Sequence, residues 1–408
     1  MPTLDDLTRR GFLTTTGSLG SAISVGVLVG ASSHAKAEEQ AVQQDDNEGQ
    51  GVTRLLAGFV VNSQPADVPQ APRAEAVRSV LNIVACAIGG APHETTERAM
   101  AALSRFFGPS QATILGRSER ADILSAALFN GITSHVLDFD DTQLSTIIHP
   151  AGPVASAILP LAEMQGISGR DFLHAFVLGV ETECRIGKVV SPSHFQAGWH
   201  ITGTAGVFGA AAAAGKLLGL NAQQMTWALG IAATQSAGLK EMFGTMSKAW
   251  HPGHAARCGL TAALLAAQDF TSSEAGIEAK EGFAHVMASE RNFDAIPHRL
   301  GETWEISENG YKPYSCGVVV HSIVDACRQL RDQHQLQADD IQRVDLRVNH
   351  YAISVCGKKT PQTGLEAKFS IYHSAAVAII YGSASPRQYT DAVAQDPSVI
   401  ALRERVHA

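Results

Sequence analysis

Small residues at helical spacing are the feature that most constrains this fold. The stretch TAGVFGAAAAAGKLLGL (204–220) is mostly Ala and Gly, and small residues recur in the apolar segments from about residue 70 to 270. Apolar positions in this region follow a helical period rather than a strand period. Small side chains let helices approach one another closely. The sequence therefore predicts an all-helical array with no room for a parallel sheet.

Individual helices can be predicted from the same periodicity. Asn221 is a favourable N-cap for the last of them, and Gly166 a natural stop for another. The predicted helices span 74–88, 121–139, 151–166, 168–187, 204–220 and 221–239.

The character of the sequence changes near residue 290. ETWEISENGYKPYS (302–315) and IQRVDLRVNHYAIS (341–354) alternate as strands do, and helical patterns occupy 316–333 and 368–382. We therefore expect a mainly α protein, with an all-helical domain over 51–290 and a smaller α+β lid domain over 291–408. A cleft between two such domains is a common place for a ligand.

The N-terminus has the features of an export signal. Arg9 and Arg10 precede a weakly apolar run, and Ala35-Lys36-Ala37 offers a cleavage site. Residues 1–37 are predicted to be a twin-arginine signal peptide, followed by a disordered linker over 38–50. The expected location is the periplasm, reached through the twin-arginine translocase, or the cytoplasm if the signal is not used. The alternatives are an ordinary secretory signal and a short membrane anchor.

Charge and cysteine content exclude several classes of function. The formal net charge is −8 and no basic stripe is present, so a nucleic-acid partner is not expected. The six cysteines form no C-x-x-C motif, which argues against an iron–sulfur cluster or a zinc knuckle. After the signal no apolar run is long enough to span a bilayer, so no stable membrane association is expected.

The motif HVLDFDDT (135–142) lies at the end of a predicted helix. If the helix continues, Asp138, Asp141 and Thr142 lie on one face. This fits a general base with a hydrogen-bonding neighbour. The alternatives are a solvated helix end and an Mg²⁺ site, although the second acidic motif available for such a site, ADD (338–340), lies in the other domain. His149, in IIHPAG (147–152), is expected to share a site with Asp138.

His200, in GWHITGTAGVFG (198–209), directly precedes a predicted helix. Thr202 and Thr204 are expected to cap this helix, and free N–H groups at its start would attract a carboxylate. The glycines run G-x-x-G-x-x-G from Gly203 without a preceding strand, so this is not a dinucleotide-binding loop. The alternative is a helix cap with a packed histidine.

The segment GTMSKAWHPGHAARCG (244–259) concentrates cationic side chains beside a small-residue helix. Lys248 and His251 are expected to lie in a loop, where they would hold an anion. A metal pair of His251 and His254 is disfavoured because Pro252-Gly253 interrupts a regular helix. The lid contributes further Lys, His and Tyr side chains, which together suit a substrate with several carboxylates: Lys312, Tyr314, His321, Lys368, Tyr372 and His373.

These motifs together resemble the MmgE/PrpD family, which includes 2-methylcitrate dehydratases, cis-aconitate decarboxylases and iminodisuccinate epimerases. The resemblance covers HVLDFDDT to HP (135–150), 198–220, 244–259, GETWEISENGYKPYSC (301–316) and DPSVIALRERV (396–406). It implies a helical domain with an α+β lid, a homodimer, and an active site without metal or cofactor. The shared chemistry is proton transfer at a carbon next to a carboxylate.

The resemblance also assigns roles to individual residues. Asp138 or His200 is expected to abstract the proton, and Tyr372 or His373 to protonate the leaving hydroxyl. The side chains that are expected to hold the substrate are Thr142, His149, Lys248, His251, Lys312 and His321.

The sequence departs from the family at three places. Gly317 stands where the decarboxylases have a histidine, and His373 where many members have a tyrosine. The chain ends at RERVHA, where relatives usually continue, so the lid is expected to be shortened. The expected function is that of a hydro-lyase acting on a small di- or tricarboxylate, similar to 2-methylcitrate dehydratase. The alternatives are an epimerase or isomerase, and an inactive periplasmic carboxylate-binding protein.

Overall fold

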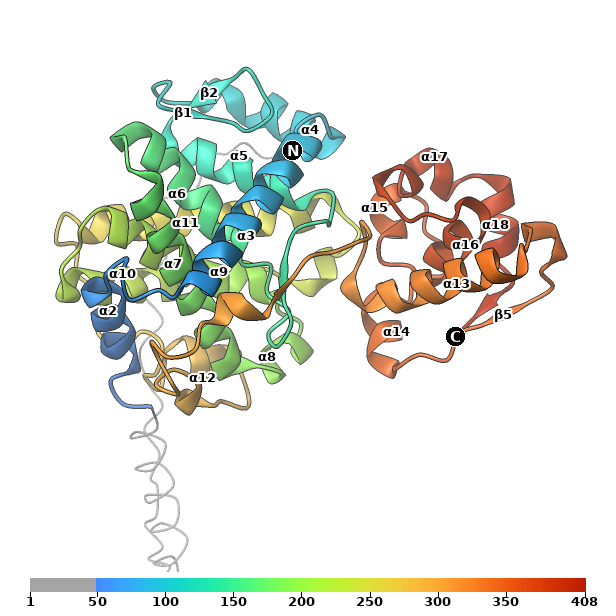
Figure 1. Cartoon of the computed structure of the whole chain (residues 1–408). Helices are drawn as coiled ribbons and strands as arrows, with labels where there is room; N and C mark the ends of the chain where they lie inside the picture. Colours follow the sequence, from blue (N-terminus) through green and yellow to red (C-terminus); the bar gives the residue numbers. More distant parts are fainter. Residues whose placement is uncertain (1–48) are drawn as a thin grey trace, which may run out of the picture. The chain divides into compact units, whose positions relative to one another are not determined.

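The computed structural model describes residues 49–408 (Figure 1). The predicted signal peptide (1–37), and all but the last two residues of the predicted linker (38–50), lie outside the described residues.

Helices build the first part of the described chain, as predicted. They are α2 (Val52–Asn62), α3 (Gln70–Gly90), α4 (Glu94–Leu103), α5 (Ile123–His135), α6 (Ala151–Gln165), α7 (Gly169–Val190), α8 (Ser193–Gln196), α9 (Ile201–Leu217), α10 (Ala222–Thr234), α11 (Met246–Ala266) and α12 (Phe283–Met287). The short 3-10 helices are η1 (Ser104–Phe106), η2 (Lys240–Met242), η3 (Phe293–Ala295) and η4 (Glu305–Glu308). Helix α9 is buried over nearly its whole length, because α6, α7, α10 and α11 pack around it (Figure 1).

Local signals fix several helix ends. The side chain of Asp122 accepts the backbone N–H groups of Leu124 and Ser125 and so starts α5. Asn221 and Gln224 form a capping box at the start of α10, and Gly166 ends α6 in the left-handed conformation. These residues satisfy backbone groups that a helix end leaves unpaired, which explains why the predicted boundaries are close.

The close helix approach expected from small residues is present where α5 crosses α11. A Cβ added at Gly131 would collide with the backbone of Gly253, and one added at Gly253 would collide with the carbonyl oxygen of Leu128. The two backbones therefore touch without intervening side chains. Only glycine fits at both positions.

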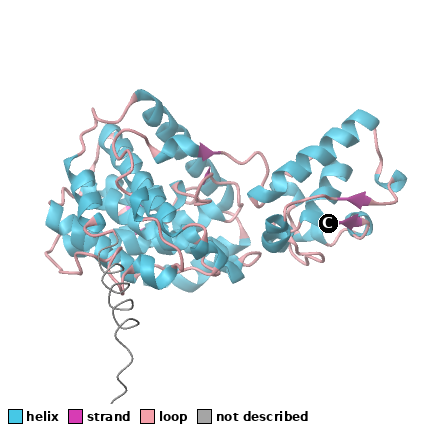
Figure 2. Ribbon diagram, turned by 90° about the horizontal axis from the view of Figure 1, so that it is seen from below, coloured by secondary structure: helices cyan, strands magenta, loops and turns pink. Residues whose placement is uncertain are grey.

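The last part of the chain is also mostly helical (Figure 2). Its helices are α13 (His321–His334), α14 (His350–Cys356), α15 (Gly364–Ala367), α16 (Ile371–Tyr381), α17 (Asp391–Ala394) and α18 (Pro397–Arg403), with the 3-10 helices η5 (Val318–Val320), η6 (Ala338–Asp340) and η7 (Pro386–Gln388). Three two-stranded sheets occur in the described residues. Antiparallel pairs join β1 (Ala112–Thr113) to β2 (Arg120–Ala121) and β3 (Thr142–Gln143) to β4 (Asn309–Gly310), and a parallel pair joins β5 (Val344–Asp345) to β6 (Val406–His407).

The two long strands predicted for this part are wrong. In 302–315 the backbone forms η4, where the N–H of Glu305 donates to the carboxylate of Glu181, and only β4 is extended. In 341–354 only β5 is extended, because Asn349 caps the start of α14. Alternating apolar residues also suit short helices when a cap residue is present, so the pattern alone was ambiguous.

The buried apolar residues form two main cores. The first core extends from Val52 to Ile306 and the second from Tyr314 to Val406. Arg185, which is 1% exposed, fastens an irregular segment to the first core, since its Nη1 donates to the carbonyls of Ala295, Ile296 and His298.

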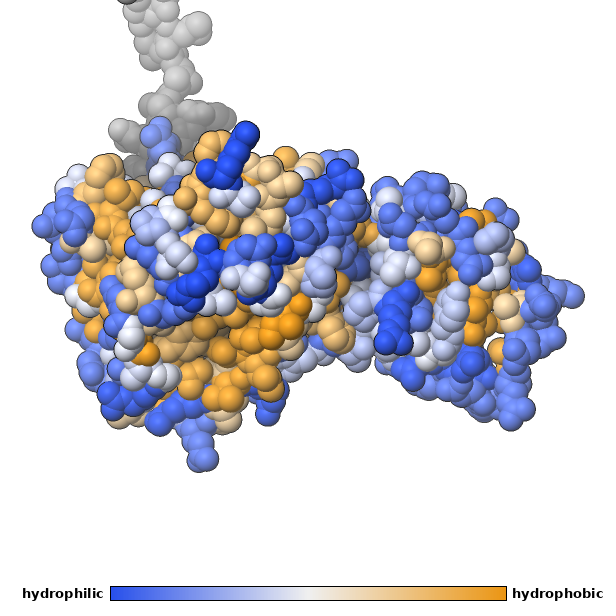
Figure 3. All heavy atoms as spheres, turned by 90° about the horizontal axis from the view of Figure 1, so that it is seen from above, coloured by the Kyte–Doolittle hydropathy of each residue, from blue (hydrophilic) through white to orange (hydrophobic). Residues whose placement is uncertain are grey.

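The surface of the described residues is mixed in character. Apolar patches lie among hydrophilic side chains in Figure 3, and exposed large apolar residues include Val77, Leu81 and Ile88 of α3. Within residues 49–408 no single helix is long and apolar enough to cross a bilayer. The segments 70–90 and 94–106 reach that length and composition only jointly, with a 78° bend between them.

Candidate active site

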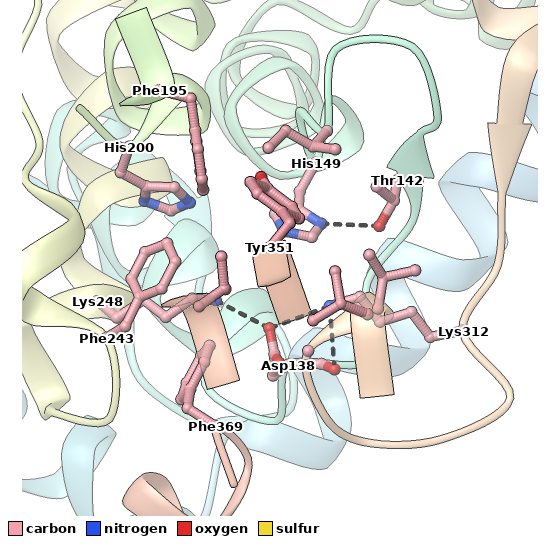
Figure 4. A pocket seen from close by; sticks show the side chains of 15 residues that line it. Asp138, Thr142, His149, Phe195, His200, Phe243, Lys248, Lys312, Tyr351 and Phe369 are labelled. Atoms are coloured by element: carbon pink, nitrogen blue, oxygen red, sulfur yellow. Dashed lines mark hydrogen bonds and ion pairs between the residues drawn. The ribbon is translucent and has the colours of Figure 1, made fainter. Parts of the chain in front are cut away.

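Residues from both cores line one pocket, with an empty volume of about 490 Å³ including its mouth (Figure 4). Six of the ten predicted site residues line it: Asp138, Thr142, His149, His200, Lys248 and Lys312. The other lining residues are Ile147, Phe195, Phe243, Gly317, Val318, Val319, Tyr351, Val355 and Phe369.

Asp138 reaches the pocket because the chain leaves the helical path just before it. Helix α5 ends at His135, and Asp138 adopts a left-handed conformation with φ of 52°. The predicted helical face shared with Asp141 is therefore wrong. The carboxylate of Asp141 instead accepts the backbone N–H of Ala151 and the side-chain amide of Asn309, outside the set that lines the pocket.

Two lysines converge on one oxygen of Asp138. The Nζ atoms of Lys248 and Lys312 lie 2.8 and 3.0 Å from Oδ1, and all three residues are at least 94% buried. Burial alone would raise the pKa of Asp138, but the two ammonium groups outweigh it and hold this pKa well below its ordinary value. The other oxygen, Oδ2, has no protein partner among the described residues. The site thus holds an ionised carboxylate whose second oxygen is buried and unpaired within residues 49–408.

Lys248 also contacts His135, a residue that the sequence motifs did not mark as part of the site. Its Nζ lies 2.8 Å from Nε2 of His135, and Nδ1 of His135 lies 2.6 Å from Asp140. Since Asp140 can only accept, Nδ1 of His135 carries the proton and Nε2 accepts from Lys248. Burial lowers the pKa of Lys248, although Asp138 opposes this effect.

The predicted loop around Lys248 is wrong, because Lys248 and His251 lie within α11. The helix continues through Pro252, although a proline removes one backbone hydrogen bond there. Pro252 is buried and faces Gly152, whose missing side chain makes room for the ring. We attribute the continuous helix to this packing.

His149 has a defined tautomer. Its Nδ1 lies 2.7 Å from the carbonyl oxygen of Asp141 and must donate to it, while Thr142 Oγ1 is 3.1 Å from the same nitrogen. Nε2 is therefore unprotonated. Burial and the charge of Lys312 lower the pKa of His149 to about 3. His149 is a neutral imidazole with a free lone pair in a pocket wall.

His200 is the N-cap residue of α9 and also lines the pocket. Its Nδ1 lies 2.7 Å from Nδ1 of His251, which sits behind it and does not line the cavity. Burial and Lys248 hold the pKa of His200 well below its ordinary value. The predicted threonine caps are wrong: Thr202 accepts the backbone N–H of His149, and Thr204 bonds His194.

Three predicted residues lie elsewhere. His321 donates from Nε2 to the carbonyl oxygen of Cys316, 3.3 Å away, and its ring stands edge-on to Tyr314. Tyr372 and His373 belong to α16, which is buried in the second core, and Nε2 of His373 donates to the carbonyl of Gln388. Their expected roles in the pocket are wrong, because tertiary packing turns these side chains away from it.

No group of three metal-ligating side chains gathers in the part of the chain that the structure describes. His254 contacts Cys258 on α11, whereas His251 contacts His200, so the two histidines do not converge. All six cysteines are free thiols, five of them buried.

The pocket's apolar side chains were missed in the sequence. Phe195, Phe243 and Phe369 each lie within five residues of a segment singled out above, and aromatic residues make up only 6% of the chain. Because aromatic residues are scarce, three phenylalanines next to the motif segments could have indicated an aromatic pocket wall.

Lys368 also lies close to the pocket. Its Nζ donates to the carbonyl of Val136, and burial lowers its pKa to about 8.

Comparison with known proteins identifies the family. The MmgE/PrpD N-terminal domain matches residues 54–296 and the MmgE/PrpD C-terminal domain matches residues 314–408. A cis-aconitate decarboxylase of Aspergillus terreus is 29% identical over 358 residues, which cover 82% of this chain and 73% of the relative. The cis-aconitate decarboxylase of Homo sapiens is 27% identical over 293 residues, covering 69% and 60% respectively. Since the two matched domains span most of the chain, the protein belongs to the MmgE/PrpD family.

Proposed function

We propose that the protein is a cofactor-independent lyase that removes a proton next to a carboxylate and eliminates water from a small hydroxy di- or tricarboxylate. 2-Methylcitrate dehydration is the family reaction of this type. The proposal rests above all on Lys248 and Lys312, which meet at one oxygen of Asp138 in a buried pocket. Paired cations of this kind bind a substrate carboxylate and stabilise the negative charge that develops beside it.

The protonation state of each group suggests which residues transfer the protons. Oδ1 of Asp138 is occupied by the two lysines, which favour its ionised form. His149 presents an unprotonated Nε2 to the pocket, and a substrate carboxylate beside it would raise its pKa from about 3, so we assign it the substrate C–H proton. Lys248, whose pKa burial lowers, then gives a proton to the leaving hydroxyl. The C–H electrons form the alkene as the C–O bond breaks and water departs.

The remaining groups hold the substrate. Lys312 is the cation that stays charged, because burial is outweighed by Asp138 and Asp140, which raise its pKa. His135 and Asp140 keep the ammonium of Lys248 in place.

The test is turnover in D₂O, followed by proton NMR with a panel of hydroxy di- and tricarboxylates. A new vinyl signal is expected, and it should be lost in His149→Asn. The matched control is His321→Asn, since His321 lies outside the pocket. A folded protein that produces neither an alkene nor deuterium exchange with any acid of the panel would contradict the proposal.

A second candidate is decarboxylation, which the names of the relatives favour. It would use the same lysines to stabilise the carbanion left by CO₂. With cis-aconitate added to the panel, the same NMR experiment separates the two, because decarboxylation gives a product with one carbon fewer. Deuterium exchange or inversion without an alkene would indicate an epimerase instead.

The homodimer, the export signal and the periplasmic location remain predictions, to be checked by light scattering and by the mass of the mature chain.

A further inference from the structure

The pocket has two chemically different walls. The polar wall carries Asp138, Thr142, His149, His200, Lys248 and Lys312. The apolar wall consists of Phe195, Phe243, Val318, Val319, Val355 and Phe369. In Figure 4 the labelled phenylalanines point into the same space as the labelled lysines.

The aromatic side chains of the apolar wall form a continuous row. Phe243 lies between its neighbours, with ring centroids 6.5 Å from Phe195 and 5.1 Å from Phe369, and Tyr351 extends the row from Phe195 at 5.9 Å. None of the residues of the apolar wall has a side-chain hydrogen-bonding group. Any part of a substrate that lies here must do without hydrogen bonds to side chains.

The charges that line the pocket leave little room for a polyanion. Two lysines and one carboxylate give a single net positive charge, and the histidines are neutral because burial lowers their pKa values. Nearby, Asp140 is bonded to His135, and Lys368 donates to a backbone carbonyl behind the wall. A substrate with three carboxylates would place two uncompensated charges in a largely dry pocket, which is costly.

The number of free hydrogen-bond donors also limits how many substrate carboxylates the pocket can bind. Of the three N–H bonds of Lys248, one points to Asp138 and one to His135. Lys312 donates to the side chain and to the carbonyl of Asp138. Each lysine thus keeps one N–H, which suffices for one bridging carboxylate. The hydroxyls of Thr142 and Tyr351 can serve a second carboxylate, and the side chains of the apolar wall offer no donor for a third.

We propose that the natural substrate carries one or two carboxylates and an uncharged alkyl or aryl arm, and that this arm lies against the apolar wall. The inference rests on the proposed function and narrows it, since tricarboxylates become poor ligands. At the edge of this wall the sulfur of Cys356 packs against the backbone of Gly317, since a Cβ at Gly317 would come within 2.7 Å of that sulfur.

Calorimetric binding of a graded series of ligands tests the proposal without requiring turnover. The ligands are malate, its 2-methyl, 2-propyl and 2-benzyl derivatives, and citrate. Affinity is expected to rise about three- to fourfold per added methylene. Citrate should bind at least tenfold more weakly than 2-propylmalate. A flat series, citrate as the tightest ligand, or no binding by the alkylated acids would each overturn the proposal.

A variant makes the comparison sharper. Val319→Lys adds a cation to the apolar wall and is expected to reverse the order of 2-propylmalate and citrate. The matched control is Leu330→Lys, which places the same charge on an exposed position of α13 and should leave the order unchanged. An unchanged order in folded Val319→Lys would contradict the position assigned to the arm.

This experiment separates the two proposals. If the alkylated acids bind in the expected order but give no alkene in D₂O, the lyase is wrong and the substrate class stands. If citrate binds best and gives an alkene, the lyase stands and the substrate class is wrong.

Discussion

Asp138 and Glu183 are both buried carboxyl groups, yet their surroundings are opposite. Asp138 has two lysines within 3.0 Å of one oxygen, whereas neither oxygen of Glu183 on α7 has a hydrogen-bond partner among the described residues. The lysines hold the pKa of Asp138 well below its ordinary value, while burial raises that of Glu183 well above it. Of these two buried carboxyl groups, the one that stays charged is the one supplied with cations, and it lies in the pocket.

Removing the paired charge should have the largest effect. Asp138→Asn leaves Lys248 and Lys312 buried without their anion, and breaking a buried pair in this way costs about 3–5 kcal/mol. Urea unfolding measures this loss, and turnover should fall at least a hundredfold. A variant as stable and active as the parent would show that the lysines have other partners.

Acid should destabilise the fold through its buried histidines, of which His149 lines the same pocket as Asp138. Burial lowers the pKa values of His149 and His251 to about 3, and those of His174, His194 and His373 to about 4. The unfolded chain binds these protons from about pH 6.5 downward, whereas the folded chain does not. Stability should therefore fall as the pH drops from 6.5 to 4, by about 1.4 kcal/mol per pH unit for each histidine at most.

Chemical denaturation at several pH values measures this slope. Replacing one buried histidine, as in His194→Gln, should make the slope shallower. Stability that stays constant between pH 6.5 and 4 would contradict the burial of neutral histidines.

Lys368 offers an intermediate case, a buried cation without a carboxylate. Its Nζ donates only to the carbonyl of Val136, and its pKa is about 8. The unfolded chain holds this proton more tightly, so the folded protein should gain stability as the pH rises from 8 to 10.5. Lys368→Met should be more stable than the parent by about 1 kcal/mol at pH 7, with a smaller difference at pH 10. A Met variant that is less stable at pH 7 would indicate that Lys368 interacts favourably with Asp138.

The smallest effect is expected at Glu183. Because this carboxyl is already neutral, Glu183→Gln should change the free energy of unfolding by less than about 1 kcal/mol. The matched change at the paired site is Asp138→Asn, and the ratio of the two effects measures how much the partners matter. A loss at Glu183 as large as that at Asp138 would mean that Glu183 is ionised.

The sequence was informative where a single residue decides the outcome. Asp122 and Asn221 start helices through their own side chains, and the motif residues Asp138, Lys248 and Lys312 did meet in one pocket. It was uninformative where packing decides. His321, Tyr372 and His373 looked equally suitable, but the direction of a side chain depends on which face of its helix the second core covers. The residues of the apolar wall come from segments up to 174 residues apart, and no local sequence pattern predicts that these segments pack together.

The crossing of Gly131 and Gly253 makes the chemistry sensitive to two residues without side chains. His135 lies one helical turn after Gly131 on α5, and Lys248 lies just over one turn before Gly253 on α11. A methyl group at either glycine would push α5 and α11 apart and so separate Lys248 from His135. Displacements near 1 Å already cost about a hundredfold in rate. Random mutagenesis should therefore show that substitutions at these two glycines abolish activity, although neither glycine lines the pocket.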